Sequence, residues 1–188
     1  MSRDIVFLNA SPSVASRSSF VAKTIAEQTE RAGYRSVFWG LGDFDPTDVL
    51  FGRTSGDSVV RFITAVKTSA AVVLASPVYK ASYSGGLKAI VDLIPPDALE
   101  RRPILGIATV RLAAHAAEVD RSFQALLDFF QARRLETLVI VDDELRVTSN
   151  AGVFSDAARE RVHKAGFALV ASIAEEGSAQ LLSKQSTV

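Results

Sequence analysis

Residues 71–92 read AVVLASPVYKASYSGGLKAIVD, and this stretch decides the fold class. It opens with small and branched apolar residues without a polar interruption, which is typical of a strand covered on both faces. A loop with Pro77, two tyrosines and the pair Gly85-Gly86 comes next, and apolar residues then recur at helical spacing. A buried strand that leads through a loop into a helix indicates a parallel sheet with helices packed against it.

The same alternation of apolar strand and amphipathic helix continues in both directions. We expect strands at residues 5–8, 34–39, 70–75, 103–108 and 138–141. We expect helices at residues 18–32, 57–69, 84–94, 115–133 and 155–175. The segment GLGDFDPTD, residues 40–48, is expected to be a cluster of turns. Five strands that alternate with five helices predict one α/β domain, a parallel sheet with helices on both faces.

Composition excludes several classes of function. The 21 basic side chains are balanced by 21 acidic ones without a basic block, so we expect no nucleic-acid surface. The chain has no cysteine, which removes disulfides and thiolate chemistry and agrees with a cytoplasmic location. No apolar stretch is long enough to span a bilayer, and no secretory signal is recognisable, so no membrane contact is expected. We expect a single domain over residues 1–176 and a polar tail at 177–188, either frayed or an oligomer contact.

The loop after the first strand, NASPSVASRSS at residues 9–19, is suited to hold a phosphate group. It is rich in hydroxyls and runs directly into a helix, whose first N–H groups are unpaired and carry a partial positive charge. Arg17 adds a guanidinium that complements a phosphate monoester. The loop matches neither the P-loop pattern nor GxGxxG. The alternative interpretation of the same residues is a plain serine-rich helix cap.

The loop after the third strand is suited to a flat ring. Tyr79 and Tyr83 offer planar amphipathic surfaces, and Gly85 and Gly86 allow a ring or backbone to approach closely. In a parallel sheet, ligands bind at the carboxyl ends of the strands, so a ligand anchored at residues 9–19 would extend toward this loop. The alternative is that the tyrosines cap the sheet or contact another subunit.

Two segments together, ASPSVASRSS at residues 10–19 and SPVYKASYSGGLKAIVDLIP at residues 76–95, resemble the NAD(P)H-dependent FMN reductases. The likeness is greatest to the alkanesulfonate-associated NADPH:FMN reductases. It extends through WGLGDFDPTDVLF, PILGIATVRLAAHAAEVD and VDDE, and so covers most of the chain. The resemblance implies a flavodoxin-like three-layer sandwich with a five-stranded parallel sheet that binds FMN without a covalent bond.

The resemblance also implies a set of FMN-binding residues on three loops. The first loop would hold the phosphate with Ser11, Arg17, Ser18 and Ser19. The loop after the third strand would lie beside the isoalloxazine with Pro77, Val78, Tyr79, Ser84 and Gly85. The loop after the fourth strand would contact the pyrimidine side of the ring with Thr109, Val110 and Arg111. The hydride chemistry belongs to the flavin, so we expect no catalytic side chain and no metal ion.

The fourth loop departs from the family pattern. It reads ATVR at residues 108–111, where the family usually has ATGG, so side chains stand where the flavin normally approaches backbone. Arg111 is a candidate cation for the reduced flavin or for the phosphates of the nicotinamide cofactor. On the following helix, Arg121 stands where the sulfonate-associated branch has a tyrosine linked to an inserted turn, so that feature is not carried over.

A few other residues admit a functional interpretation. His115 follows the fourth loop and is either a general acid or a polar contact at a helix start. The acidic run at residues 142–144 is either a divalent-cation site or charge that faces solvent or a helix. The pair Phe129-Phe130 exceeds what one core face needs, which favours a subunit interface of a homodimer or homotetramer.

The function implied is an oxidoreductase in which NADPH or NADH reduces FMN, and the reduced flavin passes to a flavin-dependent monooxygenase. The resemblance favours NADPH. One alternative is a flavin-binding or regulatory module with little turnover, motivated by the altered fourth loop. A second is a reductase that retains FMN and reduces a quinone, an azo dye or a metal ion.

Overall fold

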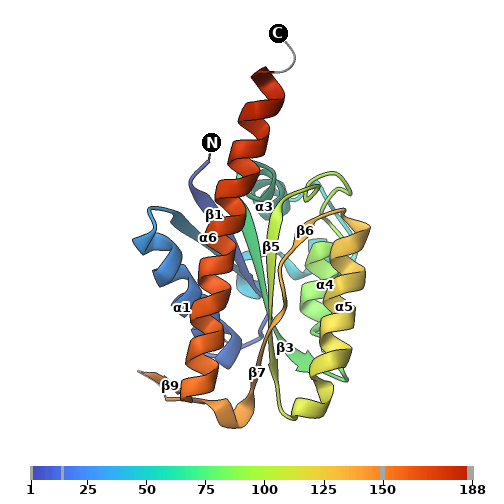
Figure 1. The fold of residues 1–188 in the computed structure, drawn as a ribbon. Helices are drawn as coiled ribbons and strands as arrows, with labels where there is room; N and C mark the ends of the chain where they lie inside the picture. Colours follow the sequence, from blue (N-terminus) through green and yellow to red (C-terminus); the bar gives the residue numbers. More distant parts are fainter. Residues whose placement is uncertain (1, 14, 149–150, 186–188) are drawn as a thin grey trace.

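Apolar strands assemble into a parallel sheet in the computed structural model, which describes residues 2–13, 15–148 and 151–185 (Figure 1). The strands of this sheet are β1 (Asp4–Asn9), β2 (Arg35–Gly40), β3 (Ala71–Tyr79), β5 (Pro103–Val110), β6 (Arg133–Arg134) and β7 (Leu138–Val141). Their order is β2-β1-β3-β5, and β6 and β7 pair with successive parts of β5 and share the fifth position. This confirms the predicted five-stranded parallel sheet.

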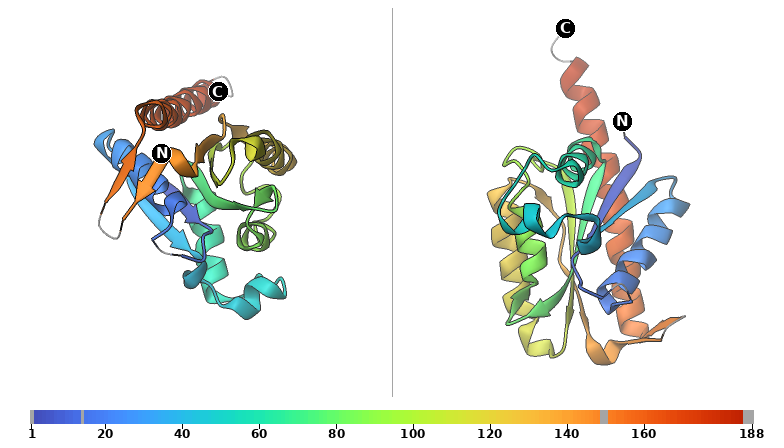
Figure 2. Two further views of the ribbon diagram at one scale, coloured as in Figure 1. Left: turned by 90° about the horizontal axis from the view of Figure 1, so that it is seen from below. Right: turned by 180° about the vertical axis from the view of Figure 1, so that it is seen from behind.

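Helices cover both faces of the sheet, as the apolar spacing predicts (Figure 2). One face carries α1 (Arg17–Arg31) and α6 (Asp156–Gln185), and the other carries α3 (Asp57–Thr68), α4 (Gly85–Val91) and α5 (Ala116–Phe129). Successive residues of β3 point to opposite faces, so Val72 and Leu74 join one core and Val73 and Ala75 join the other. The three layers of a flavodoxin-like sandwich follow from this alternation.

The structure corrects the predicted turn cluster at residues 40–48. This segment contains a 3-10 helix, η1 (Leu41–Asp43), and the start of a short helix, α2 (Pro46–Leu50). Asp45 caps α2 by accepting a hydrogen bond from the Thr47 N–H at 2.7 Å, and Pro46 occupies the first helical position, which it favours. The turn-forming residues of this segment are therefore helix caps as well.

Further short elements lie at the carboxyl edge of the sheet. They are β4 (Ser82–Tyr83), the 3-10 helices η2 (Ala113–His115) and η3 (Asp142–Glu144), and the hairpin of β8 (Leu145–Val147) and β9 (Gly152–Phe154). β4 pairs antiparallel with the end of β3. None of these elements has a clear apolar period, because each is only two or three residues long.

α6 continues where the sequence suggested a polar tail. The helix continues from residue 177 to Gln185, and residues 186–188 of the expected tail lie outside the described residues. Ion pairs of Arg133 with Glu175 and of Arg101 with Glu176 hold α6 where it passes the amino edge of the sheet. Beyond them the helix projects away from the rest of the molecule (Figure 1).

Candidate functional site

The carboxyl edge of the sheet is stepped. Asn9, the last residue of β1, pairs with Ala75, whereas β3 continues for four more residues to Tyr79. β5 accompanies this extension, with Pro77 paired to Thr109. The ends of β3 and β5 therefore stand beyond the end of β1, beside the loop that leads to α1. A ligand that lies across this step can contact the loops after β1, β3 and β5 at once.

Serine side chains make hydrogen bonds within the loop after β1 and so hold its shape. Ser16 caps α1 and accepts a hydrogen bond from the Ser19 N–H at 3.1 Å. The buried Ser18 hydroxyl donates to Asn9 Oδ1 at 3.1 Å, and the Asn9 amide donates to the Ser19 hydroxyl. Ser11, also buried, accepts from the Ser13 N–H at 3.2 Å. Ser18 and Ser19 thus shape the loop, while the N–H groups of the first helical turn point out of the helix end, where an anion can bind.

Arg17, the expected phosphate ligand, is turned toward the segment after β7. Its Nε donates to the carbonyl oxygen of Leu145 at 3.2 Å, and its Nη1 lies 3.5 Å from Asp142 Oδ1. The structure therefore brings the acidic run at residues 142–144 next to the first loop. Sequence reasoning did not connect these two segments, because their contact depends on how β7 ends beside β5.

The loop after β3 is a tight hairpin that leaves one tyrosine open. Lys80 and Ala81 have φ angles of 53° and 65°, and the chain then turns back as β4. Tyr79 is 52% exposed at the hairpin. Tyr83 packs instead against Phe123 of α5 with ring centroids 5.4 Å apart, and burial raises the pKa of its hydroxyl. Tyr79 is therefore the more exposed ring of the pair.

Ser84 ties the first loop to the loop after β3. Its hydroxyl donates to the Ala10 carbonyl oxygen at 2.8 Å and accepts from the Leu87 N–H at 3.1 Å, which caps α4. Its own N–H donates to the Ser76 hydroxyl at 2.8 Å. These bonds lie in a buried setting, so they fix the two loops relative to each other.

The two glycines that follow have different surroundings. No atom lies within 4 Å of the position that a Cβ on Gly85 would take, so space is open there. A Cβ on Gly86 would lie 2.9 Å from a methyl carbon of Leu41, so this glycine allows η1 to pack against α4. Gly85 therefore has open space beside it, whereas Gly86 serves the packing of the fold.

In the loop after β5, only one of the three expected residues presents its side chain to solvent. Val110 is fully buried in the core on the α5 side, and Thr109 is also buried. Arg111 is exposed just beyond the end of the strand. The side chain of Val110 therefore does not stand where a ligand would approach, and a ligand here would meet backbone and Arg111. His115 precedes α5 but makes no capping hydrogen bond with its side chain.

The acidic run after β7 is engaged in contacts within the protein. Glu144 accepts hydrogen bonds from the Val141 N–H at 2.9 Å and from Arg161 of α6 at 2.7 Å. Burial acts to raise the pKa of Glu144, but these hydrogen bonds and the Arg161 charge outweigh it and hold the pKa below its ordinary value. Within the described part of the chain, no group of three or more histidine or carboxylate side chains is arranged to hold a metal ion.

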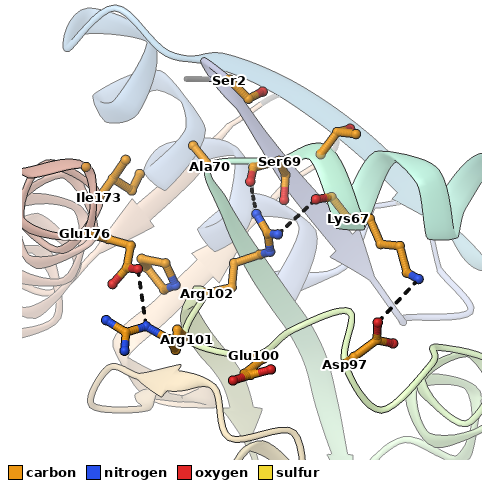
Figure 3. Close-up of a pocket in the computed structure, with 13 residues that line it drawn as sticks. Ser2, Lys67, Ser69, Ala70, Asp97, Glu100, Arg101, Arg102, Ile173 and Glu176 are labelled. Carbon is orange, nitrogen blue, oxygen red and sulfur yellow. Dashed lines mark hydrogen bonds and ion pairs between the residues drawn. The ribbon is translucent and has the colours of Figure 1, made fainter. Parts of the chain in front are cut away.

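A separate cavity of about 660 Å³ lies at the opposite, amino edge of the sheet (Figure 3). Arg102 there donates to the carbonyl oxygens of Ser69 and Lys67 and so closes the end of α3. Lys67 lies 3.8 Å from Asp97, and Arg101 lies 3.6 Å from Glu176. These cations are matched by groups of the protein itself, so the cavity is a junction between α3, β5 and α6 rather than a second anion site.

An apolar groove of about 490 Å³ runs between α4 and α5. Its walls include Val91, Ile94, Leu126 and Phe130, and Phe129 stands at its rim with 67% of its surface exposed.

Across the described residues, no helix combines the length and hydropathy that a membrane crossing needs.

Comparison with known proteins places these features in a family. The family model described as NADPH-dependent FMN reductase matches residues 3–146. The chain is 32% identical over 139 residues to FMN reductase (NADPH) of Escherichia coli strain K12, which covers 74% of this chain and 73% of that protein. It is 29% identical over 135 residues to NADH-dependent FMN reductase SfnE of Pseudomonas putida, covering 70% and 73% of the two chains.

The fold has a close counterpart among solved structures. The apo form of NADH:FMN oxidoreductase (EMOB) superposes with a TM-score of 0.80 and is 26% identical in sequence. The alignment covers 90% of this chain and 89% of that one. The family match ends at residue 146, so most of the β8–β9 hairpin and all of α6 lie beyond it.

Proposed function

The chain belongs to the NADPH-dependent FMN reductase family, and from this we propose that it reduces FMN with NADPH or NADH. The observation that carries the proposal is the junction at the carboxyl edge, where the Ser84 hydroxyl ties the loop after β3 to the Ala10 carbonyl beside the open space at Gly85. This geometry suits a flat ring with an anionic tail.

We assign each part of FMN to a group of residues at the carboxyl edge of the sheet. The loop residue Ser11 and the first turn of α1, with Arg17, would receive the phosphate, while Ser18 and Ser19 hold the loop in shape. The ring would lie over the step, beside Tyr79 and against the open face of Gly85. Pro77, Val78 and Thr109 form the floor where β3 and β5 run together.

When bound, FMN supplies the ring that accepts a hydride from the reduced nicotinamide cofactor. The protein's contribution is to hold that ring flat and to leave its outer face accessible. The exposed guanidinium of Arg111 beyond β5 would be available to stabilise negative charge on a reduced ring, and no side chain has to act as a general acid or base. Relatives named for NADPH and for NADH both match, so either cofactor is compatible with the family.

We also propose that reduced flavin leaves this protein and serves a flavin-dependent monooxygenase in the cytoplasm. The exposed positions of Tyr79 and Arg17 support an open site from which flavin exchanges. The absence of cysteine supports a reducing compartment. Dialysis tests exchange directly, because a protein that only supplies reduced flavin loses its yellow colour and a protein that retains FMN stays yellow.

Aerobic oxidation of NADPH in the presence of FMN tests the central proposal. We expect the absorbance of NADPH to fall only when both protein and FMN are present, and we expect the protein to quench flavin fluorescence. Absence of both effects with correctly folded protein, judged by circular dichroism, would rule out the reductase.

The phosphate role of Arg17 has its own test. Arg17→Ala is expected to weaken FMN binding roughly tenfold or more, because charge-assisted contacts to phosphate are strong, and to leave riboflavin binding nearly unchanged. Titration of flavin fluorescence measures both affinities. Equal weakening of FMN and riboflavin would show that Arg17 acts on the fold and not on the phosphate.

A further inference from the structure

Arg17 is held by two acceptors that differ in kind. Its Nε donates to the Leu145 carbonyl oxygen at 3.2 Å, and its Nη1 lies 3.5 Å from the Asp142 carboxylate. Arg17 is also the one cationic side chain of residues 9–19. A phosphate at the first turn of α1 and the Asp142 carboxylate therefore compete for the same guanidinium.

We propose that Asp142 is a specificity-determining residue, which restrains Arg17 and so sets how strongly the site prefers FMN over riboflavin. The inference rests on the proposed function. Asp142 need not touch the ligand, since it acts through Arg17. Riboflavin lacks the phosphate, so its binding does not require Arg17 to leave Asp142.

The geometry allows the exchange to occur without freeing Arg17 entirely. A guanidinium carries five N–H donors, so the Nε bond to Leu145 can persist while the terminal nitrogens turn from Asp142 to a phosphate. The two side chains of the ion pair are 42% and 35% exposed, and such pairs are weak in water. A phosphate dianion carries more charge than one carboxylate, so it displaces Asp142, but at a reduced net affinity.

Asp142 cannot readily follow Arg17, because its own turn is anchored. It directly follows Val141, which pairs with Val110 of β5. Glu144, two residues later, binds the Val141 N–H at 2.9 Å and Arg161 of α6 at 2.7 Å. Once Arg17 turns to a phosphate, a fixed and unpaired carboxylate remains nearby, and its repulsion favours release of the phosphorylated flavin.

Asp142→Asn tests the inference by binding alone. The amide keeps the shape but removes the charge, so FMN should bind roughly three- to tenfold tighter, as expected for a weak competing pair. Riboflavin affinity should stay within about twofold, since a charge that acts on the phosphate through Arg17 has little effect on a ligand without one. Titration of flavin fluorescence with the full chain gives both dissociation constants, and thermal unfolding checks that the variant is folded.

Asp143→Asn is the matched control. Asp143 is exposed, adjacent and of the same charge, but has no contact with Arg17, so it should leave the FMN-to-riboflavin ratio unchanged. In the background of Arg17→Ala, Asp142→Asn should lose most of its effect on FMN, because the competition needs the guanidinium.

The other outcomes each overturn the inference in a distinct way. Unchanged FMN affinity in folded Asp142→Asn excludes competition, and weaker FMN binding shows that Asp142 orients Arg17 for the phosphate instead. An effect of Asp143→Asn as large as that of Asp142→Asn points to general repulsion. If the unsubstituted protein binds neither flavin, both the proposed function and the role of Asp142 are wrong. If the protein turns over FMN but Asp142→Asn gives one of the contradicting results above, the proposed reductase activity holds and only the role of Asp142 is rejected.

Discussion

At the scale of single residues, Ser84 and Gly85 have different roles between the loops after β1 and β3. Ser84 places its hydroxyl in a buried link to Ala10, and Gly85 presents open space next to that link. A side chain at Gly85 would not disturb the fold, because no atom lies within 4 Å of its Cβ position. The same side chain would reduce the room that a planar ligand needs.

Gly85→Ala should therefore separate binding from stability. We expect FMN and riboflavin to bind roughly tenfold more weakly, since a methyl group would hold the ring off the loop, with a change in unfolding free energy within about 0.5 kcal/mol. Fluorescence titration and chemical denaturation measure the two quantities. Loss of FMN binding alone would contradict a contact with the ring, because both flavins share it.

The same residues show what a sequence can predict at this scale. Gly85 was expected at the ligand, and this stays a prediction, although the space at its Cβ position is open. Gly86 was expected there too, but it packs against Leu41 from a distant segment. Val110 was expected to contact the ring, but its side chain lies in the core, so only its backbone is left to do so. Local pattern reveals which residue types are present, whereas the direction of a side chain depends on strand register and packing.

At the scale of elements, the apolar runs of strand and helix could be predicted because burial imposes their spacing. The hairpin of β3 and β4 could not, since its turn uses Lys80 and Ala81 with positive φ, where glycine or asparagine is the usual signal. The length of α6 was underestimated because Gly177 resembles a helix stop. The contact of Arg17 with η3 depends on tertiary structure, and no local pattern indicates it.

η3 supplies a prediction about pH at this scale. The pKa of Glu144 lies below its ordinary value of 4.5, so the charged form stabilises the fold. That stabilisation is complete above pH 4.5 and is lost as pH falls through the lowered pKa of the folded state. Glu144→Gln should cost about 1 kcal/mol near neutral pH, with allowance for the partial exposure of the pair with Arg161.

The stability difference between Glu144→Gln and the unsubstituted protein should shrink steadily below pH 4.5. Denaturant unfolding at several pH values measures it. Glu160→Gln is the control, because Glu160 is exposed on the same helix as Arg161 and undergoes the same change of charge. A cost that is independent of pH, or equal in the two variants, would show that the hydrogen bonds of Glu144 are not its source.

At the scale of the whole molecule, the surfaces of the two faces differ. The α4–α5 face carries an apolar groove with Phe129 at its rim and the ion pair of Lys88 with Asp92 beside it. A groove of this kind suits a second copy of the chain related by two-fold symmetry, because opposite charges at one rim can meet their counterparts on the other. A homodimer through this face is our proposal, and a tetramer would need a further surface.

Phe129→Glu tests the homodimer. We expect at least a roughly tenfold increase in the dissociation constant of the dimer, because a charge would be buried within the interface. Phe167→Glu is the control, since Phe167 is 75% exposed on α6 and faces away from the groove. Light scattering after size exclusion measures the mass. Dissociation by the control alone would assign the interface to α6, and a monomeric unsubstituted protein would exclude both.

The projecting end of α6 has a practical consequence for handling the protein. Helix residues 177–185 extend by about 13 Å at the usual rise per residue, and they leave the molecule at the amino edge of the sheet (Figure 1). An affinity tag or a surface linker attached at the end of this helix would therefore lie on the side of the molecule opposite the carboxyl edge of the sheet. Protein immobilised in this way would turn the carboxyl edge of the sheet toward the bulk solution and leave that edge accessible to dissolved molecules.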